Sequence, residues 1–374
     1  MDLKKTVRDI LEDIESNGLS AVKKYSSKFD NYDGELSLSD DEWQSSQSVS
    51  EYDKEVVDRI AKRLTEYHAR QKGTDDVYKK GDSLFGLVTR PINRVGIYVP
   101  GGKPLPSTLL MTVIPAKLAG VKEIVVCTPP NDGTVHPLII YIAQLFEIKE
   151  LYKVGGVQAI GAMTYGAGME AVDKIFGPGN AFVNEAKRQV YGEVGIDSLA
   201  GPSEICVIAD DSAVPEYVKE DLLSQREHGS DSKAWLLTTS QKLSDYCSDP
   251  TINTLLFDNL DECVRKANQI APEHLEIITE EPMTLAEKIN TAGAVYLGNY
   301  TPVPSADYFM GSNHVLPTGR AARFSSVLTV ADFQRKMTLA SLSKDEFMKD
   351  RDLGIRMATI EGLEHHRKSM EVRQ

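Results

Sequence analysis

The sequence lacks the features that mark secreted, membrane or redox-active proteins. Its four cysteines, Cys127, Cys206, Cys247 and Cys263, are widely spaced and form no Cys-x-x-Cys pair, so neither a zinc knot nor a redox couple is indicated. We expect buried thiols in a reducing, cytoplasmic compartment. No apolar run approaches the roughly 20 residues that span a bilayer, and the charged N-terminus has no signal-peptide pattern.

Positive charge is also scarce. The formal net charge at pH 7 is −13, from 42 Lys and Arg against 55 Asp and Glu. Because nucleic-acid affinity depends on clustered basic residues that release counterions, we expect no nucleic-acid partner. With 41% hydrophobic and 26% charged residues, the 374-residue chain has the composition of a globular protein with more than one domain.

Hydrophobic periodicity divides the chain into four regions. Residues 1–94 show helical spacing, and we expect a helical region that packs with the second of two α/β domains. Short β-rich runs alternate with helical ones in 95–202 and again in 203–330, a pattern typical of βαβ units and parallel sheets. Residues 331–374 are charged and predict a helical tail that packs on a partner subunit. The fold class expected is therefore α/β.

Two glycine-rich loops follow predicted strands, at residues 98–102 (YVPGG) and 177–180 (GPGN). Each lets backbone approach a ligand closely and leads into a helix whose N-terminus favours an anion such as a pyrophosphate. Tight structural turns explain the loops equally well. The chain contains no G-x-G-x-x-G, so the pattern alone does not support a standard Rossmann dinucleotide site.

Four of the seven histidines fall in polar clusters that could carry chemistry. These clusters are Gln225 with His228, Glu273 with His274, Asp307 with His314, and Glu361 with His366. A Gln and a His three apart on a helix share one face, although such pairs more often meet only water. A Glu and a His beside a proline can divide acid and base work, and solvated loop residues are the alternative.

The same clusters contain a set of ligands suited to a metal. One amide oxygen, one carboxylate and two imidazoles fit a borderline divalent ion, zinc by preference or manganese and cobalt as substitutes. His365 and His366 point about a hundred degrees apart on a helix, so at most one of them serves a given site.

Eight segments taken in order resemble the histidinol dehydrogenase family: YVPGG, GPGN, AGPSE, SQREH, APEHLE, SNHVLPT, ARFSS and EGLEHH. The resemblance implies two Rossmann-like α/β domains, of which the NAD-binding one (95–202) is incomplete, which would explain the missing glycine fingerprint. It also implies a homodimer whose zinc sites draw residues from both subunits. The implied reaction is the four-electron oxidation of L-histidinol to L-histidine through histidinal, with two NAD molecules and one water.

Matching by motif assigns roles to individual residues. The implied zinc ligands are Gln225, His228, Asp307 and His366. The implied substrate-binding residues are these four together with Ser107, Ser203, His274, His314 and Glu361. NAD would touch Tyr98, Gln158 and Asn180. His274 would take the hydroxyl proton in the first oxidation, and Glu273 would activate the water that attacks the aldehyde in the second.

Two alternatives stay open, and the chain departs from the family pattern in places. A paralogue could act on another small polar alcohol such as a sulfonated propanediol, although Glu361 matches the residue that meets the substrate amino group and favours histidinol. A non-catalytic metal- or nucleotide-binding homologue would have lost Glu273 or His274, and both are present. The segment after Gly102 is short, and Arg226 stands where a small residue is usual.

Overall fold

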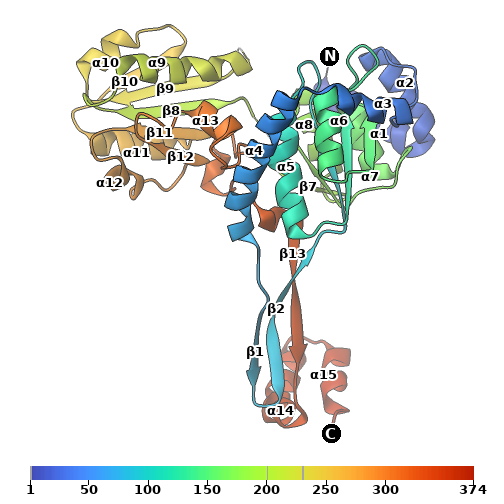
Figure 1. Cartoon of the computed structure of the whole chain (residues 1–374). Helices are drawn as coiled ribbons and strands as arrows, with labels where there is room; N and C mark the ends of the chain where they lie inside the picture. Colours follow the sequence, from blue (N-terminus) through green and yellow to red (C-terminus); the bar gives the residue numbers. More distant parts are fainter. Residues whose placement is uncertain (1, 200, 230) are drawn as a thin grey trace. The chain divides into compact units, whose positions relative to one another are not determined.

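The computed structural model describes residues 2–199, 201–229 and 231–374, except for the side chain of His228 (Figure 1). The chain forms two compact units. The first comprises Met1–Lys72 and Ile92–Phe333, and the second comprises Gly73–Pro91 and Gln334–Gln374. In the described part of the chain, every helix is too short or too polar to cross a membrane.

The first sheet of the larger unit is parallel throughout, with the strand order β5-β4-β3-β6-β7. Its strands are β3 (Arg94–Tyr98), β4 (Glu123–Thr128), β5 (Glu150–Lys153), β6 (Lys174–Phe176) and β7 (Gly195–Ile196). From β3 the chain first adds β4 and β5 on one side of that strand. It then crosses back and adds β6 and β7 on the other side. The carboxyl ends of β3 and β6 therefore form a topological switch point, where ligands bind in open α/β sheets.

Helices cover both faces of this sheet (Figure 1). They are α5 (Pro106–Ala119), α6 (Pro137–Leu145), α7 (Gly156–Tyr165) and α8 (Ala181–Val190). Val95 and Ile97 pack with α5 and α6 in one core cluster, whereas Val125 and Cys127 pack with α7 and α8 in another. Alternate strand residues thus serve opposite faces, and burial on both faces accounts for the continuous apolar runs seen in the sequence.

The N-terminal helices pack differently from the expectation. They are α1 (Leu3–Asn17), α2 (Leu19–Asp30), α3 (Asp40–Gln44) and α4 (Glu51–His68). Helices α1 and α2 lie on α7 and α8 of the first sheet and not on the second α/β domain. Gly161 makes this possible, because a Cβ there would come within 2.9 Å of the Ile14 side chain. Helix α4 reaches the second domain, where Arg63 donates a hydrogen bond of 3.0 Å to the Phe309 carbonyl.

A second parallel sheet in the same unit has the order β10-β9-β8-β11-β12. Its strands are β8 (Glu204–Ala209), β9 (Lys233–Thr238), β10 (Ile252–Leu256), β11 (His274–Ile278) and β12 (Ala294–Leu297). Its helices are α9 (Pro215–Ser224), the 3-10 turn η3 (Gln225–His228), α10 (Gln241–Tyr246), α11 (Leu260–Ile270), α12 (Pro282–Ala286) and α13 (Val303–Tyr308). The expected α/β class with two parallel sheets is confirmed. All four cysteines are buried and free, as predicted.

The smaller unit combines three antiparallel strands with two helices. They are β1 (Asp76–Lys80), β2 (Ser83–Pro91), β13 (Gln334–Ser341), α14 (Lys344–Ile360) and α15 (Glu364–Glu371). The expectation of helix through residue 94 is therefore wrong for β1 and β2. Their hairpin turns at Gly81, whose φ of +60° suits glycine, and β2 pairs with a strand far away in sequence. The helical C-terminal end is confirmed.

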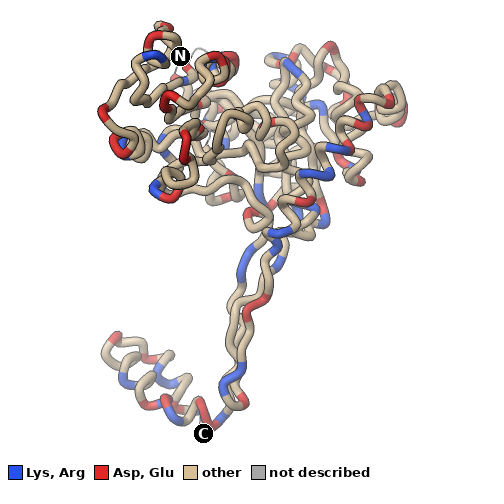
Figure 2. The backbone as a smooth tube through the Cα atoms, turned by 60° about the vertical axis from the view of Figure 1, so that its left-hand side comes forward, with Lys and Arg blue, Asp and Glu red and all other residues tan. Residues whose placement is uncertain are grey.

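The smaller unit has almost no core of its own. Of its described residues only Ser83, Val88 and Ala358 are buried. Leu353 and Ile360 on α14 are 69% and 63% exposed. Lys and Arg positions are spread along its strands, with an acidic position among them (Figure 2). So small a buried surface is insufficient to stabilise a unit of this size in isolation.

Candidate functional site

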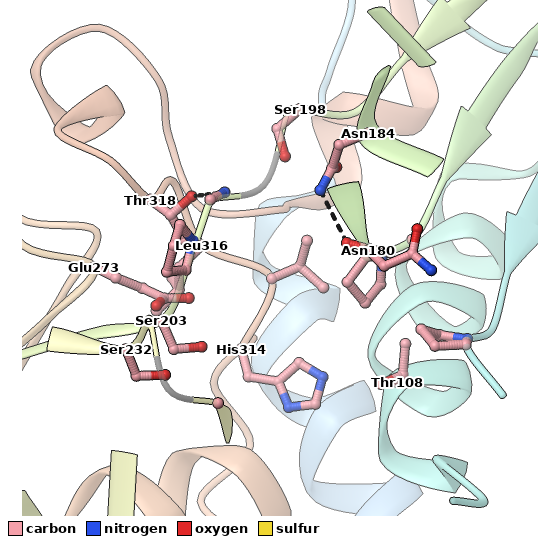
Figure 3. A pocket seen from close by; sticks show the side chains of 18 of the residues that line it. Thr108, Asn180, Asn184, Ser198, Ser203, Ser232, Glu273, His314, Leu316 and Thr318 are labelled. Atoms are coloured by element: carbon pink, nitrogen blue, oxygen red, sulfur yellow. Dashed lines mark hydrogen bonds between the residues drawn. The ribbon is translucent and has the colours of Figure 1, made fainter. Parts of the chain in front are cut away.

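A cavity of about 730 Å³ opens between the two parallel sheets of the larger unit (Figure 3). One wall consists of the loops after β3 and β6 and the start of α5. The opposite wall is formed by residues at the amino-terminal edge of the second sheet and by α13 with the loop after it. Eight residues singled out in the sequence line this one cavity: Ser107, Asn180, Ser203, Gln225, Glu273, His274, Asp307 and His314.

Other residues from the sequence analysis lie elsewhere. Tyr98 and Gln158 are buried and are not part of the described cavity lining. The Gln158 amide donates to Asp30 at 2.9 Å, and the Gly156 N–H donates to the Tyr98 hydroxyl at 3.2 Å. These two residues thus hold the turn into α7 at the carboxyl edge of the first sheet.

The remaining predicted residues belong to other parts of the chain. Glu361 and His366 are exposed residues of the smaller unit, as is His365. The side chain of His228 lies outside the described residues. Arg226 is not part of the described cavity lining, and its charge contributes, after hydrogen bonds from Thr251, to lowering the pKa of Asp249.

Glu273 lines the cavity directly before the start of β11. Ala271 ends α11 in the left-handed region with φ +51°, and a proline follows, so the chain turns sharply into the strand. The Glu273 Oε2 accepts a hydrogen bond of 3.0 Å from the Glu204 N–H, and Oε1 lies 3.7 Å from His274 Nε2. Burial raises the pKa of Glu273 to about 8, and the charges of Glu204 and Asp307 act in the same direction. Such a carboxyl can switch between acid and base near neutral pH.

His274 is held rigidly beside it. The residue is the first of β11 and pairs in parallel with Ile205 on β8 and Ala294 on β12. Its imidazole is 4% exposed and stacks on the Tyr296 ring, with centroids 6.0 Å apart and planes 26° apart. Backbone pairing on two sides and a stacked ring together fix the direction in which the imidazole faces the cavity.

Gln225 and Asp307 supply oxygen atoms suited to a cation. Gln225 is 1% exposed, and its Oε1 is buried without a hydrogen-bond partner among the described residues. Burial raises the pKa of Asp307 to about 6, and its Oδ1 lies 3.7 Å from His314 Nδ1. A buried oxygen without a donor costs free energy unless something else binds it, and a cation would do so.

The described residues of one chain do not complete a metal centre. Across the described ranges, no three His, Cys, Asp or Glu side chains cluster closely enough to hold an ion. This result is compatible with the predicted ligand set, because that set includes an amide, the undescribed side chain of His228, and His366 of the smaller unit.

The glycine loop after β6 is anchored by a buried ion pair that the sequence analysis missed. Gly177 has φ +117°, and a Cβ there would lie 2.0 Å from the Tyr98 carbonyl oxygen. Asp197 accepts from the Gly177 N–H at 2.8 Å and pairs with Lys187, whose Nζ donates to the Gly177 carbonyl at 3.0 Å. Lys187 stands on the apolar face of the helix predicted after this loop, and a lysine at such a position could have indicated a buried ion pair. Asn180 then caps α8, accepting from two backbone N–H groups.

Comparison with known proteins identifies the family. A family profile described as histidinol dehydrogenase matches residues 1–256 and 248–374. The chain is 62% identical to histidinol dehydrogenase from Thermococcus kodakarensis, over 100% of this chain and 99% of that one. The chain belongs to the histidinol dehydrogenase family. It is therefore an enzyme, an oxidoreductase.

Other histidinol dehydrogenases agree with this assignment. The protein of that name from Bacillus subtilis is 41% identical, over 99% of this chain and 93% of its own. The crystal structure of histidinol dehydrogenase from Elizabethkingia anophelis superposes with a TM-score of 0.94 at 37% identity, covering 100% of this chain and 92% of that one. The resemblance seen in the eight sequence segments is confirmed, and the likeness extends over the whole fold.

Proposed function

We propose that the chain oxidises L-histidinol to L-histidine in two NAD-dependent steps, with histidinal as the intermediate and zinc as the bound metal. The convergence of eight motif residues on one cavity carries this proposal. Each of the two oxidations moves two electrons, and one water supplies the second carboxylate oxygen. In total, one histidinol, two NAD⁺ and one water give histidine, two NADH and three protons.

Zinc would be held by Gln225 and Asp307 together with His228, and by His366 from a second copy of the chain. The unpartnered amide oxygen of Gln225 and the buried carboxyl of Asp307 support this choice. When bound, zinc would anchor the substrate nitrogens and act as a Lewis acid. Manganese or cobalt would be accepted by the same mixed nitrogen and oxygen ligands.

NAD would bind at the switch point of the first sheet, between the loops after β3 and β6. Helix α5 has no side-chain cap, and Leu105, Ser107 and Thr108 at its N-terminus line the cavity. Uncapped N–H groups at a helix N-terminus favour an anionic group. Asn180 lines the same wall, and Tyr98 and Gln158 hold the turn into α7 at the same edge of the sheet. NAD, when bound, would accept a hydride in each oxidation.

The buried side chains of Glu273, directly before β11, and His274, its first residue, would divide the proton transfers. His274 would take the hydroxyl proton as histidinol becomes histidinal. Glu273, in its ionised form, would take a proton from the water that adds to the aldehyde. The Glu204 N–H fixes one oxygen of Glu273, which leaves Oε1 directed towards His274 and the cavity. Ser203 and His314 on one wall would position the substrate, as would Ser107 on the facing wall.

A homodimer would complete the site, with Glu361 and His366 of one chain serving the cavity of the other. The smaller unit supports this proposal, because its apolar side chains are exposed in the single chain. Leu353, Met357 and Ile360 on α14 are each more than half exposed. A second copy that covers them would supply the core that this unit lacks.

The activity is tested by measuring NADH formation from histidinol together with the metal content of the purified protein. We expect about one zinc per chain and a loss of activity of at least about 10²-fold after chelation, because positioning by the metal contributes several kcal/mol. Restoring zinc should restore the activity. Oxidation of a sulfonated propanediol far in excess of histidinol would favour the paralogue, and zinc binding without turnover of either would indicate a non-catalytic homologue.

Sharing of the site between subunits is tested by mixing two inactive variants. His366→Ala should lose zinc and His274→Asn should keep it, whereas His365→Ala is the matched control and should keep both zinc and activity. Co-refolding the two inactive variants should restore about a quarter of wild-type activity, because half of the dimers are then mixed and each has one intact site. No recovery in a demonstrably mixed dimer would mean that each site is built from a single chain.

A further inference from the structure

The predicted catalytic strand carries a buried acidic residue besides Glu273, which directly precedes the strand. Glu276 lies two positions beyond His274 on β11, so the two side chains share one face of the sheet. It is 1% exposed and pairs in register with Val207 on β8 and Tyr296 on β12. A carboxyl so deeply buried needs compensating hydrogen bonds, and the reaction as derived above gives it no role.

Those hydrogen bonds run to two helices. The Glu276 Oε1 accepts from the Val303 N–H at the start of α13, at 2.7 Å. The carboxyl group also hydrogen-bonds to the Asp221 carboxyl on α9. Among the described residues no N–H or hydroxyl group donates to Oε2, so the bond between the two carboxyls requires a proton that they share.

The surroundings keep that proton in place. Burial raises the pKa of Glu276 well above its usual range, and the neighbouring Asp221 carboxyl raises it further. Burial also raises the pKa of Asp221 to about 6, and the charge of Glu220 acts in the same direction. The Tyr296 hydroxyl interacts with the charge of Glu276, and it stays neutral because burial raises its pKa as well.

The helices reached by this pair are those that carry the proposed metal ligands. Asp221 lies four residues, about one turn, before Gln225, and Val303 lies the same interval before Asp307. One carboxyl pair therefore joins β11, α9 and α13 within a turn of the residues that would touch substrate and metal.

We propose that Asp221 and Glu276 are positioning residues, whose hydrogen-bonded pair sets the spacing between Gln225 and Asp307. The proposal rests on the proposed function for the identity of the metal, but the link between the helices exists without it. Groups behind metal ligands typically affect metal affinity by about 10- to 100-fold when removed.

The test compares variants that break the pair with variants that keep it. Asp221→Ala removes the bond, whereas Asp221→Asn and Glu276→Gln retain a donor and an acceptor of nearly the same shape. Glu220→Ala, an exposed neighbour on the same helix, is the matched control. Zinc dissociation constants are measured by competition with a chromophoric chelator, and amide exchange of residues 303–308 is measured in the zinc-free protein.

We expect Asp221→Ala to weaken zinc by at least about tenfold, with both amide variants and the control within about twofold of wild type. Exchange at 303–308 should be about tenfold faster in Asp221→Ala and unchanged in Asp221→Asn. Wild-type zinc affinity in Asp221→Ala would overturn the positioning role. If the wild type binds no zinc, the proposed function fails. The exchange rates at 303–308 then test the link between the helices by themselves. Equal exchange in Asp221→Ala and Asp221→Asn would overturn that link.

Discussion

Replacing His274 by asparagine is expected to lower kcat for histidinol oxidation by about 10³-fold, because general-base proton transfer typically contributes about 10²- to 10⁴-fold. Asparagine occupies a similar volume and keeps polar atoms in the cavity, but it cannot accept a proton near neutral pH. The effect should fall on the first oxidation. Single-turnover formation of NADH from histidinol measures it directly, and oxidation of added histidinal in the same variant should be much less affected.

The controls for this variant separate chemistry from folding. His274→Asn should bind as much zinc as wild type, because His274 is not among the proposed ligands. Tyr296→Phe keeps the stacked ring and removes only the hydroxyl, so it should retain most of the activity. A His274→Asn enzyme with more than about a tenth of the wild-type kcat would show that another group takes the hydroxyl proton.

The local chemistry of the site could be anticipated where it depends on neighbours in sequence. Glu273 and His274 are adjacent and follow a helix-breaking proline, so their joint approach to a cavity is readable from the chain. The role of Gln225 as a metal ligand is predicted less strongly, because a Gln and a His three apart on a helix are common. Only the buried, unpartnered amide oxygen distinguishes it, and burial of one atom depends on packing that the sequence does not display.

Contacts between distant segments could not be predicted. Nothing in the spacing of Asp221 and Glu276 indicates that they meet, since they lie 55 positions apart, with η3, β9, α10, β10 and α11 between them. The pairing of β2 with β13 is a similar case, because two strands some 250 positions apart must be brought together by the fold. Loop-closure entropy and tertiary packing decide such pairings, and neither has a local signature.

The sequence also does not predict which element an amphipathic helix packs against. The apolar stripe of α1, which includes Val7 and Ile14, predicts a helix correctly but fits any complementary groove. In the fold it packs on α7, where the Ile14 side chain comes within 2.9 Å of the place that a Cβ of Gly161 would occupy. In a sequence, a glycine inside a helix can indicate either a weak helix or a place where another helix packs closely. The sequence therefore does not show that α1 packs on the face of α7 that carries Gly161.

Glu273→Gln is expected to slow the oxidation of added histidinal by about 10²- to 10³-fold while affecting the first oxidation far less. Glutamine keeps the hydrogen bond from the Glu204 N–H but cannot take a proton from the attacking water. The measurement is single-turnover NADH formation from histidinal and, separately, from histidinol. Equal losses in both half-reactions, here and in His274→Asn, would refute the division of labour between the two residues.

The pH dependence of the same variant distinguishes a base from a structural carboxyl. The pKa of Glu273 is raised to about 8, and only its ionised form can act, so wild-type histidinal oxidation should rise with pH and level off above about 8. Glu273→Gln should lack that rise. Burial favours the protonated carboxyl, so its stabilising contribution is complete below the unfolded pKa of about 4.3 and is lost as pH rises through about 8.

Stability and activity should therefore move in opposite directions at this position. Glutamine stays neutral at every pH, so Glu273→Gln should denature at a higher temperature than wild type above pH 8 and at nearly the same temperature near pH 4 to 5. A carboxyl kept only for packing would show no loss of activity on this replacement. A gain in stability at high pH with a loss of histidinal oxidation is the combination expected of a residue retained for its chemistry, because burying its charge costs free energy that only catalysis offsets.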